Sequence, residues 1–141
     1  MRHDEFIGLV QDRAALPDRG SAERAVRATL ETVAERVPDG LVRHLAAQLP
    51  QEIAEHLHRV EAAREAGPEG GDAPERFDLT AFAGRVAWRG AVSEETAVRE
   101  AAAVFEVLDA ALAPELMERL SHALPQDIRE LLPTARAQEP T

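Results

Sequence analysis

Glu55 and His58 have the residue types and the spacing of a metal-binding pair. A carboxylate followed three residues later by a histidine on a helix is the pair that di-iron helical bundles use, and such a centre needs two of these pairs. Much of the first half of the chain recurs in the second half, and in that alignment Glu55 corresponds to Glu130 but His58 to Pro133. A second pair is therefore missing. We interpret Glu55 and His58 as a helix-surface pair and predict no metal site.

The other histidines show no shared arrangement. His56 and His58 are two residues apart on a predicted helix and therefore point to different faces. His44 and His122 do not coincide when the two halves of the chain are aligned. A site that arose before a duplication would keep its histidines in both halves, so we interpret these side chains as surface residues.

Nucleophilic and phosphate-binding motifs are missing from the sequence. The chain has no cysteine, which excludes thiolate nucleophiles, disulfides and cysteine-based zinc sites. Ser93 is typical of a helix N-cap and Ser21 of an early helical position, and neither lies in a Gly-x-Ser-x-Gly elbow. Gly70 and Gly71 are not followed by the Lys-Ser/Thr of a phosphate loop. The sequence therefore predicts no catalytic residue and no cofactor.

Trp88 is the only tryptophan and lies near the end of a predicted helix, beside Arg89 and Gly90. We interpret its side chain as a lid on the core between the two halves of the chain. The alternative is an exposed aromatic anchor for a protein partner, because tryptophan is enriched among the residues that dominate binding energy at interfaces.

A Leu-Pro-Gln corner occurs twice, at Leu49-Pro50 and at Leu124-Pro125. Its structural interpretation is a sharp turn between two helices, set by proline and held by the flanking leucine and isoleucine. The alternative is a binding motif. Leu49, Pro50, Leu124 and Pro125 are therefore, with Trp88, the candidate interaction residues.

The corners belong to a longer repeat. Residues 45–53, LAAQLPQEI, return as residues 120–128, LSHALPQDI. When this alignment is extended without gaps, apolar positions match from Ala22 and Ala97 to Leu57 and Leu132. A repeat of this length predicts a tandem duplication of one structural unit, packed with pseudo-twofold symmetry.

Apolar residues recur at helical spacing along nearly the whole chain, and no segment alternates as a strand does. The fold predicted is all-α, with four helices in each copy. Their predicted bounds are 3–14, 20–36, 39–48 and 51–65, then 79–88, 94–111, 114–122 and 125–132.

Four segments follow from this pattern. Residues 1–65 form the first helical repeat and residues 78–132 the second. Residues 66–77 are rich in glycine, proline and acids, which predicts a linker. Residues 133–141 lack apolar anchors and are predicted to be a frayed tail.

Composition limits the partners. The 141 residues are 45% hydrophobic and 30% charged, and the net charge is −10. Dispersed acidity repels phosphate backbones and anionic lipids, so nucleic-acid and membrane partners are not expected. The sequence has no stretch of about 18 apolar residues that would predict a transmembrane helix. Residues 1–6 lack the apolar stretch of a signal peptide, so none is expected. We expect a cytoplasmic location.

A family resemblance follows from the repeated helices. Phe6 and Val10 match Phe82 and Val86 at an offset of 76 residues, because the first loop of the first copy has one extra residue. Each pair precedes an alanine- and leucine-rich helix and a Leu-Pro corner. This arrangement resembles the prokaryotic family of domain of unknown function 2267, over residues 3–58 and again over 77–132. The family pattern often continues after the first Leu-Pro with an aromatic-rich segment, which this chain lacks. No activity is assigned to the family, so the resemblance implies no catalytic residues.

The sequence favours a non-enzymatic cytoplasmic interaction or scaffold module that binds a protein partner or self-associates. One alternative is a small helical metal-binding or stress-related enzyme. Another is a nucleic-acid-associated accessory protein, which the acidity opposes.

Overall fold

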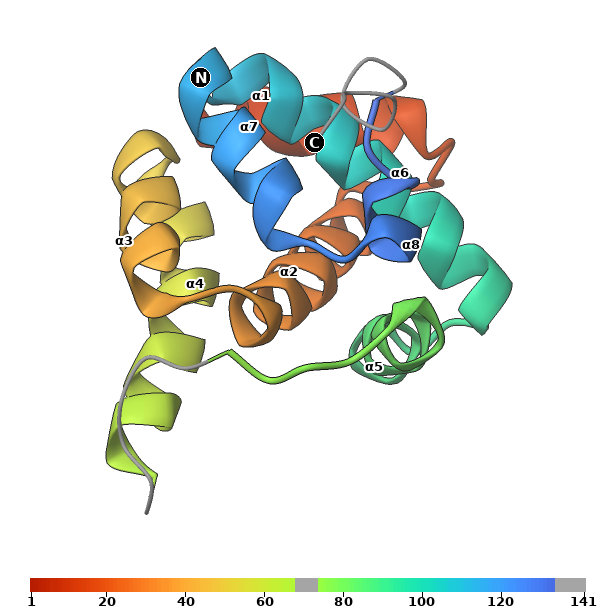
Figure 1. The fold of residues 1–141 in the computed structure, drawn as a ribbon. Coiled ribbons are helices and arrows are strands. Elements are labelled where there is room, and N and C mark those ends of the chain that lie inside the picture. The colour runs from red at the N-terminus through yellow and green to blue at the C-terminus, as the bar shows by residue number, and fades with distance from the viewer. Residues whose placement is uncertain (68–73, 134–141) are drawn as a thin grey trace.

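The chain folds into eight α-helices across residues 1–67 and 74–133, the parts of the chain that this computed structural model describes (Figure 1). No strand occurs in these residues, so the predicted all-α fold is confirmed. Seven helices lie within two residues of their predicted bounds. The helices are α1 (His3–Arg13), α2 (Arg19–Arg36), α3 (Asp39–Gln48), α4 (Gln51–Ala66), α5 (Leu79–Gly90), α6 (Glu94–Ala111), α7 (Pro114–Ala123) and α8 (Gln126–Arg129).

Helix α8 corrects the prediction of a helix over residues 125–132, because it is only four residues long. The N–H groups of Leu131 and Leu132 donate to carbonyls three residues back, at 2.9 and 3.0 Å, which tightens the chain after the helix. Pro133 follows, and a proline disfavours the helical conformation of the residue before it. The helical pattern of the sequence therefore stops one turn early.

Three helices begin at a side chain that caps the first turn. Asp18 accepts a hydrogen bond from the backbone N–H of Ser21 at 2.7 Å, and Asp78 and Ser93 accept equivalent bonds in α5 and α6 at 3.0 and 3.1 Å. These bonds satisfy backbone donors that have no partner inside the helix. The predicted N-cap role of Ser93 is confirmed.

Helices α1 and α5 are both followed by an alanine in the left-handed conformation, Ala15 with φ 53° and Ala91 with φ 55°. The N–H of the following residue, Leu16 or Val92, donates to the carbonyl five residues back, at 2.9 and 3.1 Å. This is the hydrogen bond of a Schellman motif, in which glycine is the usual residue at the left-handed position. The chain thus reverses sharply after both helices with alanine, not glycine, at the left-handed position.

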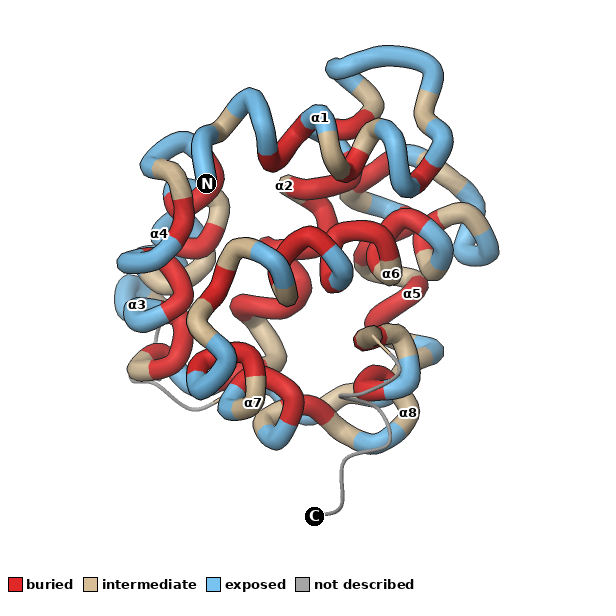
Figure 2. Tube along the Cα trace, turned by 90° about the horizontal axis from the view of Figure 1, so that it is seen from above, coloured by how far each residue is buried: buried red, intermediate tan, exposed pale blue. Residues whose placement is uncertain are grey.

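Helix α2 is the centre of the fold. It packs against α1, α4, α5 and α6, and Figure 2 shows long buried stretches in α2 and α6. Phe6, Phe82 and Phe105 are completely buried in one core, and the rings of Phe82 and Phe105 are stacked with centroids 6.3 Å apart. Residues from both halves of the chain share this core, so neither half has a core of its own.

The two halves of the chain follow the same order of helices. In the alignment of the sequence repeat, the first residues of α5, α6, α7 and α8 coincide with those of α1, α2, α3 and α4. Between the halves, α2 packs against α5 and α1 against α6, while α2 meets α6 and α3 meets α7. Each of these contacts joins helices of the first half to helices of the second.

Part of the predicted linker lies against the helices. The N–H of Glu75 donates to the carbonyl of Glu35 at 2.9 Å, and the carbonyl of Phe77 accepts from Arg36 at 3.1 Å. The guanidinium of Arg85 lies 4.0 Å from the centroid of the Phe77 ring. Residues 68–73 of the predicted linker 66–77, and 134–141 of the predicted tail 133–141, lie outside the described residues.

Two threonines on α2 are completely buried but differ in their hydrogen bonds. The Thr29 hydroxyl has no partner among the described residues. The Thr32 hydroxyl donates to the carbonyl of Ala28 at 2.8 Å and accepts from Arg89 at 2.9 Å. A buried polar group without a partner costs stability, whereas a bonded one does not.

We therefore expect Thr29→Val to raise the free energy of unfolding by about 1 kcal/mol, because it removes the unpaired hydroxyl at constant shape. Thr32→Val is the matched control and is expected to lower it by about 1–3 kcal/mol, since Arg89 then loses an acceptor. Urea denaturation followed by circular dichroism measures both. Equal effects of the two substitutions would contradict the difference in hydrogen bonding.

Candidate functional site

Trp88 lies on the surface, with 87% of the residue exposed. The interpretation of Trp88 as a lid on the core is therefore wrong. The core stripe of α5 consists of Phe82, Ala83, Val86 and Ala87, and Trp88 follows Val86 by two residues, which places it about 200° around the helix from that residue. The alternative of an exposed aromatic side chain agrees with this position.

Two hollows flank Trp88. The first has a volume of about 560 Å³ and lies between α5, α2 and the segment before α5. The second, of about 570 Å³, lies between α5 and the start of α6. Both are lined by Trp88 and by Gly84, which is one helical turn before it. The indole therefore stands as a ridge between the two hollows. Their common border includes Gly84, which has no side chain.

The first hollow is built on an ion-pair cluster. Glu35, on α2, accepts hydrogen bonds from Arg89 at 2.7 and 2.8 Å and from Arg85 at 3.0 Å. Arg85 also donates to Glu75 at 3.2 and 3.3 Å, and Arg89 lies 3.5 Å from Glu31. Arg85 and Arg89 lie on α5, four residues apart, so both guanidinium groups reach α2 from the same face. Carboxylates and guanidinium groups balance in this hollow.

The cluster shifts the protonation equilibria of its members. Burial alone raises the pKa of Glu35, but the hydrogen bonds and positive charges of Arg89 and Arg85 outweigh burial and hold this pKa below its ordinary value. The hydrogen bond to Glu35 raises the pKa of Arg89 against the opposing effect of burial. The ionised pairs are thus the stable form, and they fix α5 on α2.

The second hollow has a different lining. Ala87, Ala91 and Val92 provide apolar surface beside Trp88, and Glu94 is its only charged residue. Glu94 is exposed and has no ion pair among the described residues. A Cβ atom at Gly84 would lie 3.4 Å from Glu94 Oε1, so the carboxylate is folded back from α6 onto α5.

The other sequence-predicted interaction residues do not form a surface with Trp88. Leu49 and Leu124 are buried, 8% and 2% exposed, and Pro50 and Pro125 are partly buried. Each leucine ends its helix with a hydrogen bond to a carbonyl three residues back. The leucines of the two corners therefore contribute to the core rather than to an exposed apolar patch.

Glu55 and His58 are both exposed on α4. His58 lies 3.6 Å from Glu61, and His56 accepts from Arg59 at 2.6 Å. The ordered partners of these histidines are neighbours on the same helix. The geometry agrees with the interpretation of Glu55 and His58 as a helix-surface pair.

A group of three carboxylates was not found by sequence reasoning. Within the described residues, oxygens of Asp39, Glu61 and Glu65 lie within 4.8 Å of one another. Arg64 donates to Asp39 at 2.5 Å and Arg43 to Glu61 at 2.8 Å. Arginines therefore already neutralise two of the three carboxylates, and we interpret the group as part of the packing of α4 on α3.

Two further hollows lie away from Trp88. One, of about 420 Å³, has histidines and charges of both signs, from α1, α2 and α4, and its lining includes His3, Arg24, Glu52 and His56. The other, of about 300 Å³, lies between α3 and α7, where Arg119 donates to His44 at 2.7 Å. Neither is lined by a tryptophan or a phenylalanine.

The fold and this surface define an all-helical domain whose conspicuous exposed feature is one tryptophan between two hollows. Residues 3–131 match the family described as "Uncharacterized conserved protein (DUF2267)", and the chain belongs to that family. The match is continuous, so the family unit spans both halves of the chain. Among curated proteins, none matches. Within residues 1–67 and 74–133, none of the helices has the length and apolar character needed to cross a membrane.

Gly84 and Gly8 give a matched test of the border between the hollows, because each lies in a helix interior and the two correspond in the sequence repeat. Alanine at either position is expected to raise the free energy of unfolding by about 0.5–1 kcal/mol. A Cβ at Gly8 meets no atom within 4 Å, and a Cβ at Gly84 meets only Glu94 Oε1, at 3.4 Å. A methyl group therefore fits at both positions. Thermal unfolding of Gly84→Ala and Gly8→Ala checks this expectation, and a loss of stability in Gly84→Ala would contradict the described packing.

Glu35→Gln is expected to lower the free energy of unfolding by about 1–3 kcal/mol at neutral pH, because Arg85 and Arg89 lose a charged acceptor. The pKa of Glu35 is lowered on folding, so its contribution is complete above the ordinary pKa of 4.5 and is lost as pH falls through the folded value. Wild type and variant should therefore converge in acid. Denaturant titrations between about pH 3 and pH 7, the range in which carboxyl groups ordinarily ionise, measure this convergence.

Glu23→Gln is the control for this measurement, because the pair of Glu23 with Arg19 is exposed on the same helix. It is expected to change the free energy of unfolding by less than about 0.5 kcal/mol at any pH. An equal effect of the two substitutions would show that the cluster is no stronger than an ordinary surface pair.

Proposed function

We propose that the protein is a non-enzymatic interaction module that binds a protein partner through the face around Trp88. The observation that carries the proposal is the 87% exposure of this tryptophan beside two hollows. Leaving a tryptophan in water forgoes the stabilisation that its burial gives. Covering it in a complex recovers that free energy, which is why tryptophans dominate many interfaces.

The rigidity of this face supports the same function. Helix α5 is held to α2 by the bonds of Glu35 to Arg85 and Arg89, on the side of the helix next to Trp88. A helix that is already fixed loses little backbone freedom when a partner covers it. The ion-pair cluster thus fixes the helix that carries Trp88 and leaves the indole exposed.

We also propose that the fold is a tandem duplication with pseudo-twofold symmetry. Arg13 pairs with Glu106 at 3.3 Å and Arg89 with Glu31 at 3.5 Å. The alignment of the two halves matches Arg13 with Arg89 and Glu31 with Glu106, so it exchanges these two pairs. The contacts of α2 with α5 and of α1 with α6 are exchanged in the same way.

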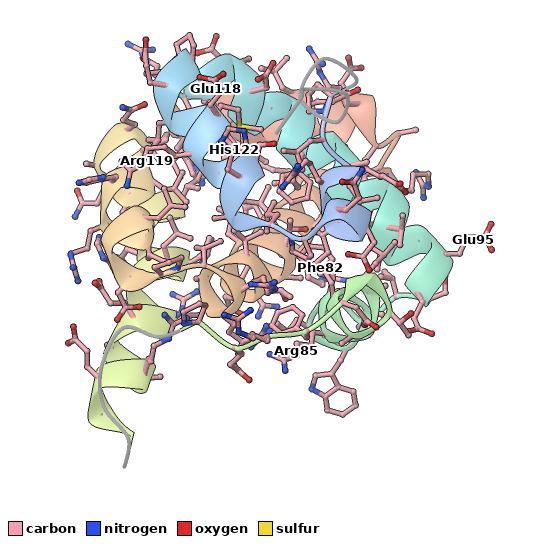
Figure 3. All side chains as sticks on the ribbon, viewed as in Figure 1. Phe82, Arg85, Glu95, Glu118, Arg119 and His122 are labelled. Carbon is pink, nitrogen blue, oxygen red and sulfur yellow. The ribbon has the colours of Figure 1, made fainter. Side chains whose placement is uncertain are left out.

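A further contact supports this symmetry. Arg119 on α7 projects towards α3 (Figure 3) and donates to His44, its counterpart in the first half of the chain. A residue meets its own counterpart only near a twofold axis. The interaction face would then be a later specialisation, because the positions that correspond to Trp88 and Glu35 are occupied by Asp12 and Ala110.

The test is capture of proteins from an extract of the source cells by the immobilised full chain. We expect Trp88→Ala to reduce capture about tenfold or more, a typical loss for an interface hot spot. Asp12→Ala is the matched control, because Asp12 is exposed at the corresponding position of α1. Its capture should equal that of the wild type.

The stability of Trp88→Ala completes the experiment. Because the side chain is exposed, we expect its free energy of unfolding to remain within about 0.5 kcal/mol of the wild type. Loss of capture without loss of stability supports an interaction face. Unchanged capture by a folded Trp88→Ala contradicts it.

A further inference from the structure

The second hollow beside Trp88 indicates the chemistry of the partner, given the proposed function on which this inference rests. We propose that it receives an arginine side chain from the protein partner, stacked on the indole of Trp88 and paired with the carboxylate of Glu94. Both residues line this hollow, Trp88 from α5 and Glu94 from α6.

The electrostatics of the two hollows differ, and this difference selects a cation. In the first hollow, the charges of Arg85 and Arg89 are matched by Glu35 and Glu75. In the second, Glu94 is the only charged lining residue and has no ion pair within residues 1–67 and 74–133. A carboxylate beside an aromatic face favours a positive group, because the π-face attracts cations.

The direction of the Glu94 side chain strengthens this argument. An acid in the first turn of a helix is ordinarily explained by the helix dipole, and Glu95 has this role too. Figure 3 shows Glu95 pointing away from the helices into solvent. Glu94 instead lies against Gly84, inside the hollow. The two neighbouring acids thus have the same charge and share the first turn of α6, but their surroundings differ.

The shape of the lining favours arginine. A guanidinium group is planar, stacks on an indole and donates two parallel hydrogen bonds to one carboxylate, which an ammonium group does not. Ala87, Ala91 and Val92 provide apolar surface for the methylene groups of the side chain. The net charge of −10 attracts a basic segment to the molecule as a whole.

The experiment uses the full chain and two probe peptides, acetyl-Ala-Arg-Ala-amide and the same peptide with citrulline, the neutral isostere of arginine. Trp88 is the only tryptophan, so a single indole N–H resonance in an ¹⁵N–¹H spectrum reports the hollow. We expect the arginine peptide to shift this resonance saturably and the citrulline peptide to bind about threefold or more weakly. Added salt should weaken the arginine peptide selectively.

Glu94→Gln and Glu95→Gln separate the hollow from the general acidity of the surface. Both remove one charge from the first turn of α6. Glu94→Gln should raise the dissociation constant of the arginine peptide about threefold or more, and Glu95→Gln less than about 1.5-fold. Gly84→Ala, which adds a methyl group to the lining, should weaken binding, whereas Gly8→Ala should not.

Equal shifts with the two peptides, or equal effects of Glu94→Gln and Glu95→Gln, would overturn the inference, as would failure of the arginine peptide to bind. The proposed function has a separate result. If Trp88→Ala abolishes capture from the extract but the peptide experiment fails, the interaction face remains and its partner is not recognised through arginine. If the peptide binds as expected while Trp88→Ala leaves capture unchanged, the hollow is a cation site and the proposed function is wrong.

Discussion

Helix α2 packs against four other helices, α1, α4, α5 and α6, and the positions of these four depend on it. Its buried Ala22, Ala25 and Ala28 allow close approach of those helices. A helix buried on several sides needs partners for most of its polar residues. On the side of α5, Thr32 and Glu35 find one in Arg89, whereas the Thr29 hydroxyl has none among the described residues. The placement of α5, and with it of Trp88, therefore depends on α2.

Local signals were sufficient to predict most of the helices. Helical periodicity and punctuation by proline, glycine and Ser93 located seven of them to within two residues. Helix α8 was predicted too long, because Leu132 continues the apolar pattern of the sequence and is buried without being helical. Periodicity reports which residues face the core, and a turn can bury a leucine as well as a helix can.

The candidate site was predicted less well, for two physical reasons. The sequence indicates Trp88 as a candidate. Its large apolar ring favours burial, whereas its angle from the Phe82–Val86 stripe favours exposure, and the side chain is exposed. The bonds of Glu35 to Arg85 and Arg89 join residues 50 and 54 positions apart, and no local pattern reports such a pairing. In the sequence, Glu94 does not differ from any other acid at the start of a helix. Only its contact with Gly84 in the structure distinguishes it from Glu95.

The left-handed alanines after α1 and α5 have a consequence for the order of folding. For an alanine, this conformation costs about 1–2 kcal/mol relative to a right-handed one, and in an isolated helix only the local hydrogen bonds of the Schellman motif offset that cost. Ala15 and Ala91 are therefore expected to hold it stably only when the helices on either side are already packed. The reversal into α2 and the reversal into α6 are then late events, completed when the shared core closes, so neither pair of helices is expected to persist as an independent hairpin before the whole chain has collapsed.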